Sequence, residues 1–320
     1  MPWLVSEEEQ APDCFDADLK DYIQQMALFN ILRFILNHPI NRNNRRAALI
    51  RWLRWQLGSR LLPGEVVWPF VNDACLVVRP GMTGATGNVY VGLHEFEDMA
   101  FLLHYLRPED LFVDVGANVG SYTVLAGAGI GAACLSIEPL PQAFAALRRN
   151  IAINEMGGRV QALNLGLASQ PGVLRFTSRL DTVNHVLSKE EDHADAVEVP
   201  VRTLDEVVGD ASPALLKMDV EGYETEVLAG AQRVLANPAL RALILELNGS
   251  GRRYGFDEDA IRRQLRDLGF TACAYRPFER ALTPRAETAA GGNTLFARDL
   301  EYVENRLRTA PAFRVSGWEL

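Results

Sequence analysis

From residue 111 onward, short apolar runs alternate with amphipathic segments. The apolar runs have the length of buried strands, and the segments between them carry apolar residues at helical spacing. In one of these segments, Phe144, Leu147 and Ile151 share one face of a helix. The alternation predicts a doubly wound, mostly parallel α/β sheet with helices on both faces. The predicted strands are 111–115, 133–137, 160–165, 173–177, 215–219, 242–247, 271–275 and 294–297, and the predicted helices are 119–126, 141–154, 225–235 and 257–268.

Before residue 95 the pattern differs. Residues 16–57 predict two or three helices, interrupted near Pro39. Residues 66–91 contain three short β-type runs separated by turns with glycine and proline, which predicts a small β hairpin or a three-stranded cap. A helix over 95–105 follows. We expect four segments: a helical extension over 1–62, the hairpin or cap over 63–94, the main domain over 95–300 and a tail over 301–320.

The densest motif is a glycine-rich turn in the segment LFVDVGANVG. The strand ends with Asp114, and Gly116 and Gly120 allow a tight turn and a close approach of the backbone to a ligand. The next strand ends with Glu138, whose carboxylate can accept two ribose hydrogen bonds. Pro139 then stops that strand, which also favours ribose binding. This layout is typical of a nucleotide-binding βαβ unit.

The chemistry of this turn favours a cationic ligand. The turn reads G-A-N-V-G and lacks the middle glycine of the dinucleotide fingerprint, whose helix N-terminus holds a pyrophosphate. With the acidic residue before it, the turn favours a ligand that carries a cationic amine and no phosphate, as S-adenosylmethionine does. The cradle predicted for the methionine part of this cofactor consists of Asp114, Gly116, Ala117, Asn118 and Gly120.

A second motif, LKMDVEGYE, ends the predicted strand 215–219. Lys217 and Asp219 are two residues apart and therefore point to the same face of the strand. A carboxylate here can orient a substrate, accept its proton or contact the cofactor amine, whereas the alternative is an ion pair that only closes the strand. Asp219, Glu221 and Glu246 offer carboxylates for Mg²⁺. No cluster has convincing metal-ligand spacing, so we expect no metal.

One loop differs from the others in its length and polarity. Residues 178–196 are rich in charge and contain His185, and a loop this long in a compact domain is more often functional than idle. We expect it to form part of a lid over the active site, with His185 as a candidate general base. The alternative is a solvated histidine, which is the more common case for a loop.

Charge and cysteine content narrow the classes of function. The formal charge of −9 argues against binding of nucleic acid. The four cysteines lie singly, without a CxxC pair, which is typical of reduced thiols in a cytoplasmic protein. The chain opens with acidic residues where a signal peptide has basic ones. The longest early apolar stretch, 26–36, is too short to span a bilayer.

The N-terminal extension contains a basic run. Residues 41–60 hold six arginines and no acidic residue, with Trp52 and Trp55 among them. One interpretation is a basic helix face that packs on the acidic body. The other is contact with an anionic lipid head group, a sugar phosphate or a partner protein. The sequence does not indicate an oligomeric state. The arginines are Arg42, Arg45, Arg46, Arg51, Arg54 and Arg60.

Several segments together resemble one known family, the FkbM-type methyltransferases, which belong to the Rossmann-like enzymes that depend on S-adenosylmethionine. The resemblance covers about residues 90–300. It implies a seven-stranded sheet with an antiparallel last strand, and methylation of a hydroxyl oxygen on sugars of bacterial glycans or on secondary metabolites. The similar segments are VDVGANVGSYT, IEPLPQAFAALRRNIAIN, the V-x-x-x-T-L-D-E-V segment 199–207, LLKMDVEGYETEVLAGA and LILELN.

The resemblance also implies roles for individual residues. Glu138 corresponds to the ribose ligand, and Asn164, Gly166 and Leu167 fall where adenine contacts often lie. Asp219 falls in the KMDVEG motif. An enzyme that methylates an alcohol aligns the acceptor and removes its proton. The candidates for that base, in order, are Lys217, Asp219 and His185.

Two other functions share parts of this pattern. An NAD-dependent oxidoreductase has the same βαβ unit and ribose carboxylate, but the missing glycine and the KMDVEG strand weigh against it. A non-catalytic Rossmann-like binding protein would tolerate substitution of Lys217 or Asp219 without loss of function. The sequence therefore predicts an O-methyltransferase with S-adenosylmethionine as cofactor and a small-molecule or glycan hydroxyl as acceptor.

Overall fold

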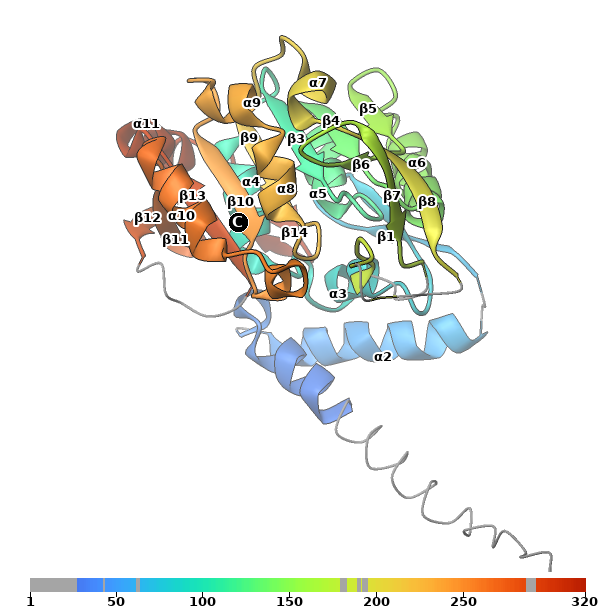
Figure 1. The fold of residues 1–320 in the computed structure, drawn as a ribbon. Helices are drawn as coiled ribbons and strands as arrows, with labels where there is room; N and C mark the ends of the chain where they lie inside the picture. The colour runs from blue at the N-terminus through green and yellow to red at the C-terminus, as the bar shows by residue number, and fades with distance from the viewer. Residues whose placement is uncertain are drawn as a thin grey trace, which may run out of the picture.

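The computed structural model describes residues 28–42, 44–61, 64–178, 183–188, 191, 195–285 and 292–320. At its centre lies an eight-stranded sheet in the order β12-β11-β13-β10-β9-β3-β4-β5 (Figure 1). Strands from β10 to β5 are parallel to their neighbours, whereas β13 is antiparallel to both β10 and β11. The strands are β3 (Leu111–Val115), β4 (Ala133–Ile137), β5 (Val160–Leu163), β9 (Leu215–Met218), β10 (Ala242–Glu246), β11 (Thr271–Arg276), β12 (Ala281–Pro284) and β13 (Asn293–Ala297).

Helices cover both faces of this sheet (Figure 1). Successive strand residues face opposite sides, so Phe112 and Leu215 belong to one buried cluster while Val113 and Leu216 belong to another. The first cluster is covered by α4 (Phe96–Tyr105), α5 (Ser121–Val124) with its π-helical continuation η2 (Leu125–Ile130), α6 (Pro141–Ile153) and α11 (Leu300–Arg308). The second is covered by α7 (Leu204–Val208), α8 (Glu224–Ala229), α9 (Gln232–Ala236) and α10 (Glu258–Asp267).

Smaller elements surround this body. Residues 28–37 are helical and lead to η1 (Pro39–Asn41), α2 (Arg45–Leu61) and α3 (Thr83–Val91). Among the described residues, no helix is long and apolar enough to cross a membrane. The remaining elements are the hairpin β1 (Val66–Pro69) and β2 (Cys75–Val78), the three-stranded sheet of β6 (Gly166–Leu167), β8 (Val197–Arg202) and β7 (Gly172–Phe176), the turns η4 (Ser250–Tyr254) and η5 (Pro277–Glu279), and the hairpin β14 (Arg314–Val315) and β15 (Trp318–Glu319).

The predicted α/β class is confirmed, with differences in detail. The main sheet has eight strands instead of seven, because β12 adds to its edge antiparallel to β11. The prediction of a third β-type run, NVYVGL, is wrong, because its first four residues, 88–91, form the end of helix α3. Residues 301–320 are more than a tail, since α11 packs on α4. The part of the predicted N-terminal helices before residue 28 lies outside the described residues.

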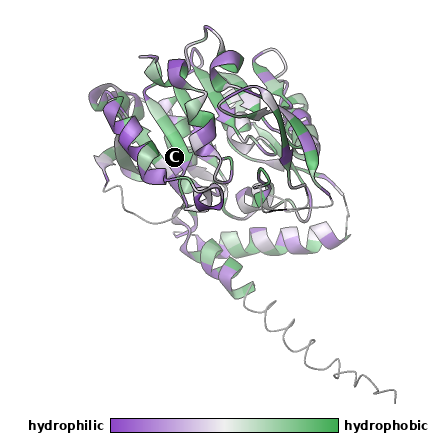
Figure 2. Cartoon of the chain, in the orientation of Figure 1, coloured by the Kyte–Doolittle hydropathy of each residue, from purple (hydrophilic) through white to green (hydrophobic). Residues whose placement is uncertain are grey.

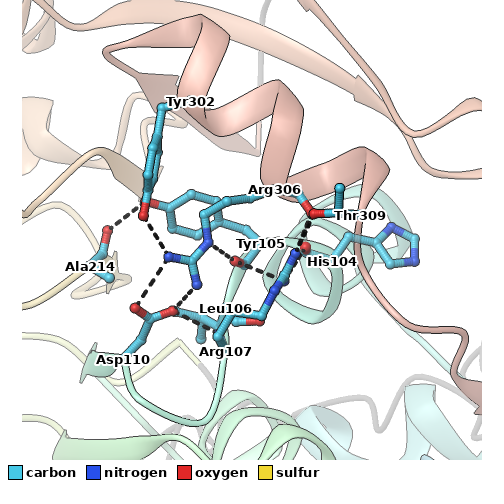
Figure 3. Close-up of polar contacts among 9 residues, drawn as sticks. All are labelled: His104, Tyr105, Leu106, Arg107, Asp110, Ala214, Tyr302, Arg306 and Thr309. Carbon is cyan, nitrogen blue, oxygen red and sulfur yellow. Dashed lines mark hydrogen bonds and ion pairs between the residues drawn. The ribbon is translucent and has the colours of Figure 1, made fainter.

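A buried ion pair fixes the entry to β3 (Figure 3). The guanidinium of Arg306 on α11 pairs with Asp110, and both side chains are about one-tenth exposed. Arg306 also donates from Nε to the carbonyl oxygen of Tyr105 at 2.8 Å, and the backbone amide of Arg107 donates to Asp110 at 2.7 Å. These contacts join α11 to the end of α4 and to the turn that leads into the first strand of the site.

Asn150 on α6 ties the β1–β2 hairpin to the glycine-rich turn. Its side chain is completely buried. The Oδ1 atom accepts from the backbone amide of Val77, and Nδ2 donates to the carbonyl oxygen of Val119, each at 2.7 Å. One amide group therefore satisfies backbone groups of two separate segments, and Asn154 at the end of α6 adds two hydrogen bonds to Cys75 of the same hairpin.

We expect Asn150→Ala to lower the free energy of unfolding by about 2–4 kcal/mol, because it leaves two buried backbone groups without partners. Urea denaturation measures this loss. The matched control is Asn305→Ala on the exposed side of α11, for which a change within about 0.5 kcal/mol is expected. Equal losses of unfolding free energy in the two variants would show that the hydrogen bonds of Asn150 do not stabilise the fold.

Candidate active site

A cavity of about 760 Å³ lies at the carboxyl ends of the parallel strands, where open α/β sheets bind their ligands. Gly116 follows β3 in this wall, Glu138 follows β4, and Asp219 follows β9. Glu246 closes the wall at the end of β10. Glu138 and Asp219, which the sequence predicts at the ends of two strands, therefore line one cavity.

The turn after β3 fits against the tip of β9. Gly116 has a φ of +73°, and an added Cβ would lie 1.9 Å from the carbonyl oxygen of Asp219. The backbone amides of Gly116 and Ala117 both donate to the carbonyl oxygen of Ile137 at 3.0 Å. Only glycine fits this contact, because any side chain would push the two strand ends apart.

Glu138 is held in place by two backbone amides. Asn118 N and Leu140 N each donate to its carboxylate at 2.8 Å. Burial raises the pKa of Glu138 to about 7, and these two hydrogen bonds counteract part of that rise. Asn164 donates from Nδ2 to the carbonyl oxygens of Glu138 and Pro139 at 2.9 Å. The segment that carries Glu138 is thus fixed before any ligand arrives.

Lys217 and Asp219 meet on one face of β9, as their spacing predicts. Lys217 Nζ lies 3.1 Å from Asp219 Oδ2 and 5.0 Å from the centroid of the Tyr122 ring. Burial disfavours the charge on Lys217, but the carboxylates of Asp219, Asp114 and Glu95 outweigh it and raise the pKa of the lysine. Lys217 therefore stays protonated at neutral pH.

Asp114 lies behind the cavity wall rather than on it. Its side chain is 1% exposed and accepts a hydrogen bond from Thr123 Oγ1 at 2.7 Å. Thr123 in turn shares a 2.7 Å hydrogen bond with Ser136 on β4. Asp114 stands in register with Lys217 across the parallel strands. It thus supplies a counter-charge and holds the first turn of α5.

Three carboxylates gather at the acidic end of the cavity. Asp219, Glu221 and Glu246 each offer an oxygen atom, and these atoms lie within 4.8 Å of one another. Burial, followed by repulsion from Asp219 and Glu221, raises the pKa of Glu246 to about 9. Burial and Asp219 likewise raise the pKa of Glu221 to about 7. This end favours a positive group, and the expectation of no metal stays a prediction.

The predicted cofactor residues fall into two groups. Members of the first line the cavity, and members of the second support its wall. The lining residues are Gly116, Ala117, Asn118, Glu138, Pro139, Leu167 and Asp219. The supporting residues are Asp114, Gly120, Asn164 and Gly166. Both glycines of the second group are tightly packed: an added Cβ would lie 2.5 Å from Leu147 at Gly120 and 3.0 Å from Val201 at Gly166.

His185 lies beside the cavity without lining it. Neighbouring residues of the same loop, Val183 and Val186, are on the cavity wall. His185 Nδ1 lies 2.9 Å from the carbonyl oxygen of Val183, and Nε2 lies 3.4 Å from Glu191 Oε1. Nδ1 thus has a hydrogen-bond partner within the loop, whereas Nε2 is buried beside Glu191 without a hydrogen bond. The other predicted lid residues, 179–182, 189–190 and 192–194, lie outside the described residues, so the lid stays a prediction.

Sequence reasoning missed much of the remaining wall. Tyr122, two residues after the glycine motif, is 5% exposed and faces the cavity near Lys217. His94 and Glu95, just before α4, give no motif by which they could be found. The other end of the cavity is apolar, because β7, β8 and the loop between them supply Phe176, Val183, Val186 and Val197.

The sheet order and the position of the cavity define the class of this protein. An antiparallel strand inserted beside otherwise parallel strands, with helices on both faces, makes a Rossmann-like α/β fold. The cavity lies at the edge where such folds bind nucleotide-like ligands, and it carries a carboxylate at the end of the second strand.

Comparison with known proteins gives the family. The model of the methyltransferase FkbM domain matches residues 114–272. The 31-O-demethyl-FK506 methyltransferase FkbM of Streptomyces tacrolimicus is 29% identical over 215 residues, which cover 56% of this chain and 80% of the relative. The hexuronic acid methyltransferase AglP of Haloferax volcanii is 30% identical over 148 residues, 44% of this chain and 58% of the relative. A crystal structure of methyltransferase FkbM from Methylobacillus flagellatus, 19% identical, covers 60% of this chain and 44% of its own with a TM-score of 0.41.

The chain belongs to the FkbM methyltransferase family, as its motifs predict. The matched segment begins at Asp114 and contains both the glycine-rich turn and the KMDVEG motif. These are the two motifs whose backbones meet at Gly116 and Asp219.

We expect Glu246→Gln to make the ligand-free protein less sensitive to alkaline pH. The folded-state pKa of Glu246, about 9, is raised above that of an unfolded glutamate, so the folded protein holds this proton more tightly. The stability it contributes is present at low pH and is lost as the pH rises toward 9. Between pH 7 and 9 the parent should lose roughly 2 kcal/mol in free energy of unfolding that the variant keeps.

Urea denaturation at both pH values measures this difference. Glu109→Gln, at an exposed glutamate remote from the cavity, is the control and should follow the parent. An equal decrease of the unfolding free energy between pH 7 and 9 in all three proteins would show that Glu246 does not hold the proton.

Proposed function

We propose that this protein is an S-adenosylmethionine-dependent O-methyltransferase whose acceptor is a hydroxyl group on a sugar, a glycan or a secondary metabolite. The observation that carries the proposal is the coincidence of the FkbM domain with a preformed cavity walled by both of its motifs. The printed names of the relatives, a methyltransferase of a demethylated FK506 and one of a hexuronic acid, support a hydroxylated acceptor.

The two ends of the cavity suit the two ends of the proposed cofactor. Glu138 is buried and aimed into the cavity, where it would accept hydrogen bonds from ribose hydroxyls. The backbone from Gly116 to Asn118 and the carboxylate of Asp219 would border the amino acid part. Leu140 and Leu167 would contact the adenine ring. When bound, the cofactor supplies an electrophilic methyl group on a sulfonium ion.

The residues of this chain would align the acceptor hydroxyl and take its proton. Among the predicted bases, Lys217 is held in its protonated form by the surrounding carboxylates, which makes it a positioning residue for Asp219. Asp219 is 30% exposed at its side chain and lines the cavity, so its carboxylate can reach a ligand. His185 does not line the cavity and would first have to turn away from its loop contact with Val183. We therefore assign the proton acceptor to Asp219.

Binding of the cofactor product tests the first part of the proposal. S-adenosylhomocysteine should bind the parent in isothermal titration calorimetry, and Glu138→Ala should weaken binding by roughly 1–3 kcal/mol, because hydrogen bonds to a charged acceptor are lost. Since the pKa of Glu138 is about 7, affinity should fall as the pH drops below 7 and the carboxylate is protonated. Glu138→Gln keeps the size of the side chain and should remove this pH dependence. A heat of binding with NAD, and none with S-adenosylhomocysteine, would overturn the assignment of the cofactor.

Turnover tests the second part. Asp219→Asn keeps the shape of the side chain and removes its charge, so methyl transfer should fall about 10²–10⁴-fold, far more than the affinity for S-adenosylhomocysteine, which loses only the contact of this carboxylate with the amino acid part. Transfer of labelled methyl groups into extracts of cells that lack the protein measures this rate, and a mass increase of one methylene group identifies the acceptor. The control is His185→Asn, for which we expect near-parental transfer. Transfer by Asp219→Asn within about twofold of the parent would exclude Asp219 and return His185 to consideration.

A further inference from the structure

The N-terminal helices expose an unusual amount of apolar surface. The described part of the chain has fourteen exposed large hydrophobic side chains, and eight of them lie within residues 28–61. Isolated exposed apolar residues need no explanation, but a concentration on one segment marks an interaction surface. The eight residues are Leu28, Phe29, Ile31, Phe34, Ile50, Leu53, Leu57 and Leu61.

The inner face of α2 is attached to the body of the protein. Trp55 is 5% exposed and packs edge-on against Trp68, with ring centroids 5.9 Å apart. Arg51 donates from Nε and Nη2 to the carbonyl oxygen of Tyr90 at the end of α3, at 3.1 and 3.0 Å. The helix is therefore mounted in one orientation, which fixes the direction of its outer face.

That outer face carries an apolar stripe. Ile50, Leu53, Leu57 and Leu61 recur at intervals of three or four residues and are 48–77% exposed. Figure 1 shows α2 at the outside of the molecule, and Figure 2 shows hydrophobic and hydrophilic residues mixed along it. The stripe is thus exposed although the opposite side of the same helix is buried.

Positive charge surrounds the stripe. Residues 28–61 contain seven arginines and no acidic residue, whereas the whole chain has a net charge of −9. Arg51 is the one whose guanidinium packs on the body through Tyr90, so the interpretation of the basic run as a packed face holds for that arginine. The arginines that flank the stripe are exposed: Arg42, Arg45, Arg46, Arg54 and Arg60.

We propose that the outer face of α2, together with the exposed apolar residues of the helix at 28–37, docks on an anionic lipid membrane. Apolar side chains that enter the head-group region, with arginines beside them that contact anionic lipids, are the chemistry of an interfacial helix. A second copy of this chain fits less well, because a two-fold contact through α2 would bring the same arginines together. This inference does not depend on the proposed methyl transfer.

Docking would bring the lipid surface close to the catalytic cavity. Helix α2 packs on α3, and Met82 and Gly84 at the start of α3 line that cavity. A second cavity of about 450 Å³ lies between residues 30–39 and 94–97, and it shares His94 and Glu95 with the first. The lipid surface would therefore lie on the side of the cavity that the start of α3 and residues 94–95 line.

Flotation of the full-length protein with lipid vesicles tests the proposal. We expect binding to phosphatidylcholine vesicles that contain phosphatidylglycerol, a decrease with added salt, and little binding to vesicles of phosphatidylcholine alone. The triple variant I50S/L53S/L57S and the charge variant R46E/R54E should each reduce binding at least tenfold. Val173→Ser, at an exposed apolar residue of β7 that is 63% exposed, is the matched control and should bind like the parent.

Two further measurements make the result decisive. Thermal unfolding and titration with S-adenosylhomocysteine check that the variants remain folded. Both should give parental values, because none of the changed residues lines the cavity. Absence of vesicle binding by the folded parent overturns the proposal, and so does binding that both α2 variants retain. A dimer in sedimentation that I50S/L53S/L57S dissociates, without vesicle binding by the parent, would assign the surface to a second copy instead.

Discussion

The buried ammonium group of Lys217 is the charge on which the acidic edge of the sheet depends. It lies on the strand between β3 and β10, in register with Asp114 and 3.1 Å from Asp219. Taking a charged carboxylate out of water costs several kcal/mol unless an opposite charge compensates it. Asp114 is 1% exposed and has Lys217 as its compensating cation. The sheet can therefore carry acidic residues at adjacent strand ends because one lysine sits among them.

Lys217 compensates the carboxylates of the cavity to different degrees, and this difference sets their protonation. Lys217 contacts Asp219 directly, whereas burial and mutual repulsion raise the pKa of Glu246 to about 9 and that of Glu221 to about 7. Carboxyl groups that differ in protonation at neutral pH thus lie side by side, an arrangement that suits proton transfer. At the opposite end, the small sheet β6-β8-β7 contributes an apolar wall. The cavity therefore suits a ligand with a positive group at one end and a flat apolar group at the other.

The sequence predicts most of the central sheet because its strands are buried on both faces and read as continuous apolar runs. The predicted bounds of β3 and β4 agree with the structure, and β9 ends one residue early. Strand β8 was missed because Val199 and Val201 face inward while Glu198, Pro200 and Arg202 face solvent, which breaks the run into alternating residues. The segment NVYVGL has residues that favour strands, yet packing of α3 against α2 and β2 makes it helical.

The site was predicted where a motif defines it and missed where only tertiary packing does. Glu138, Gly116 and Asp219 follow from strand ends and turn chemistry, which are local properties of the chain. Asp114 was assigned to the ligand because its strand ends at the cavity, but its side chain points to Thr123 and Lys217. Tyr122 reaches the cavity from α5 and Glu95 from the position before α4, and the placement of both depends on contacts far apart in the sequence. No pattern within a single segment reports such contacts.

The close contact between Gly116 and the carbonyl oxygen of Asp219 couples the structures of two motifs that lie about a hundred residues apart in the sequence. Neither backbone can shift without the other, so the two segments have to diverge together. Recombination between relatives that exchanged one segment alone would combine surfaces shaped for different partners. Chimeric enzymes built to move the acceptor specificity of one relative onto another should therefore keep residues 114–222 from a single parent and place their junctions outside that range.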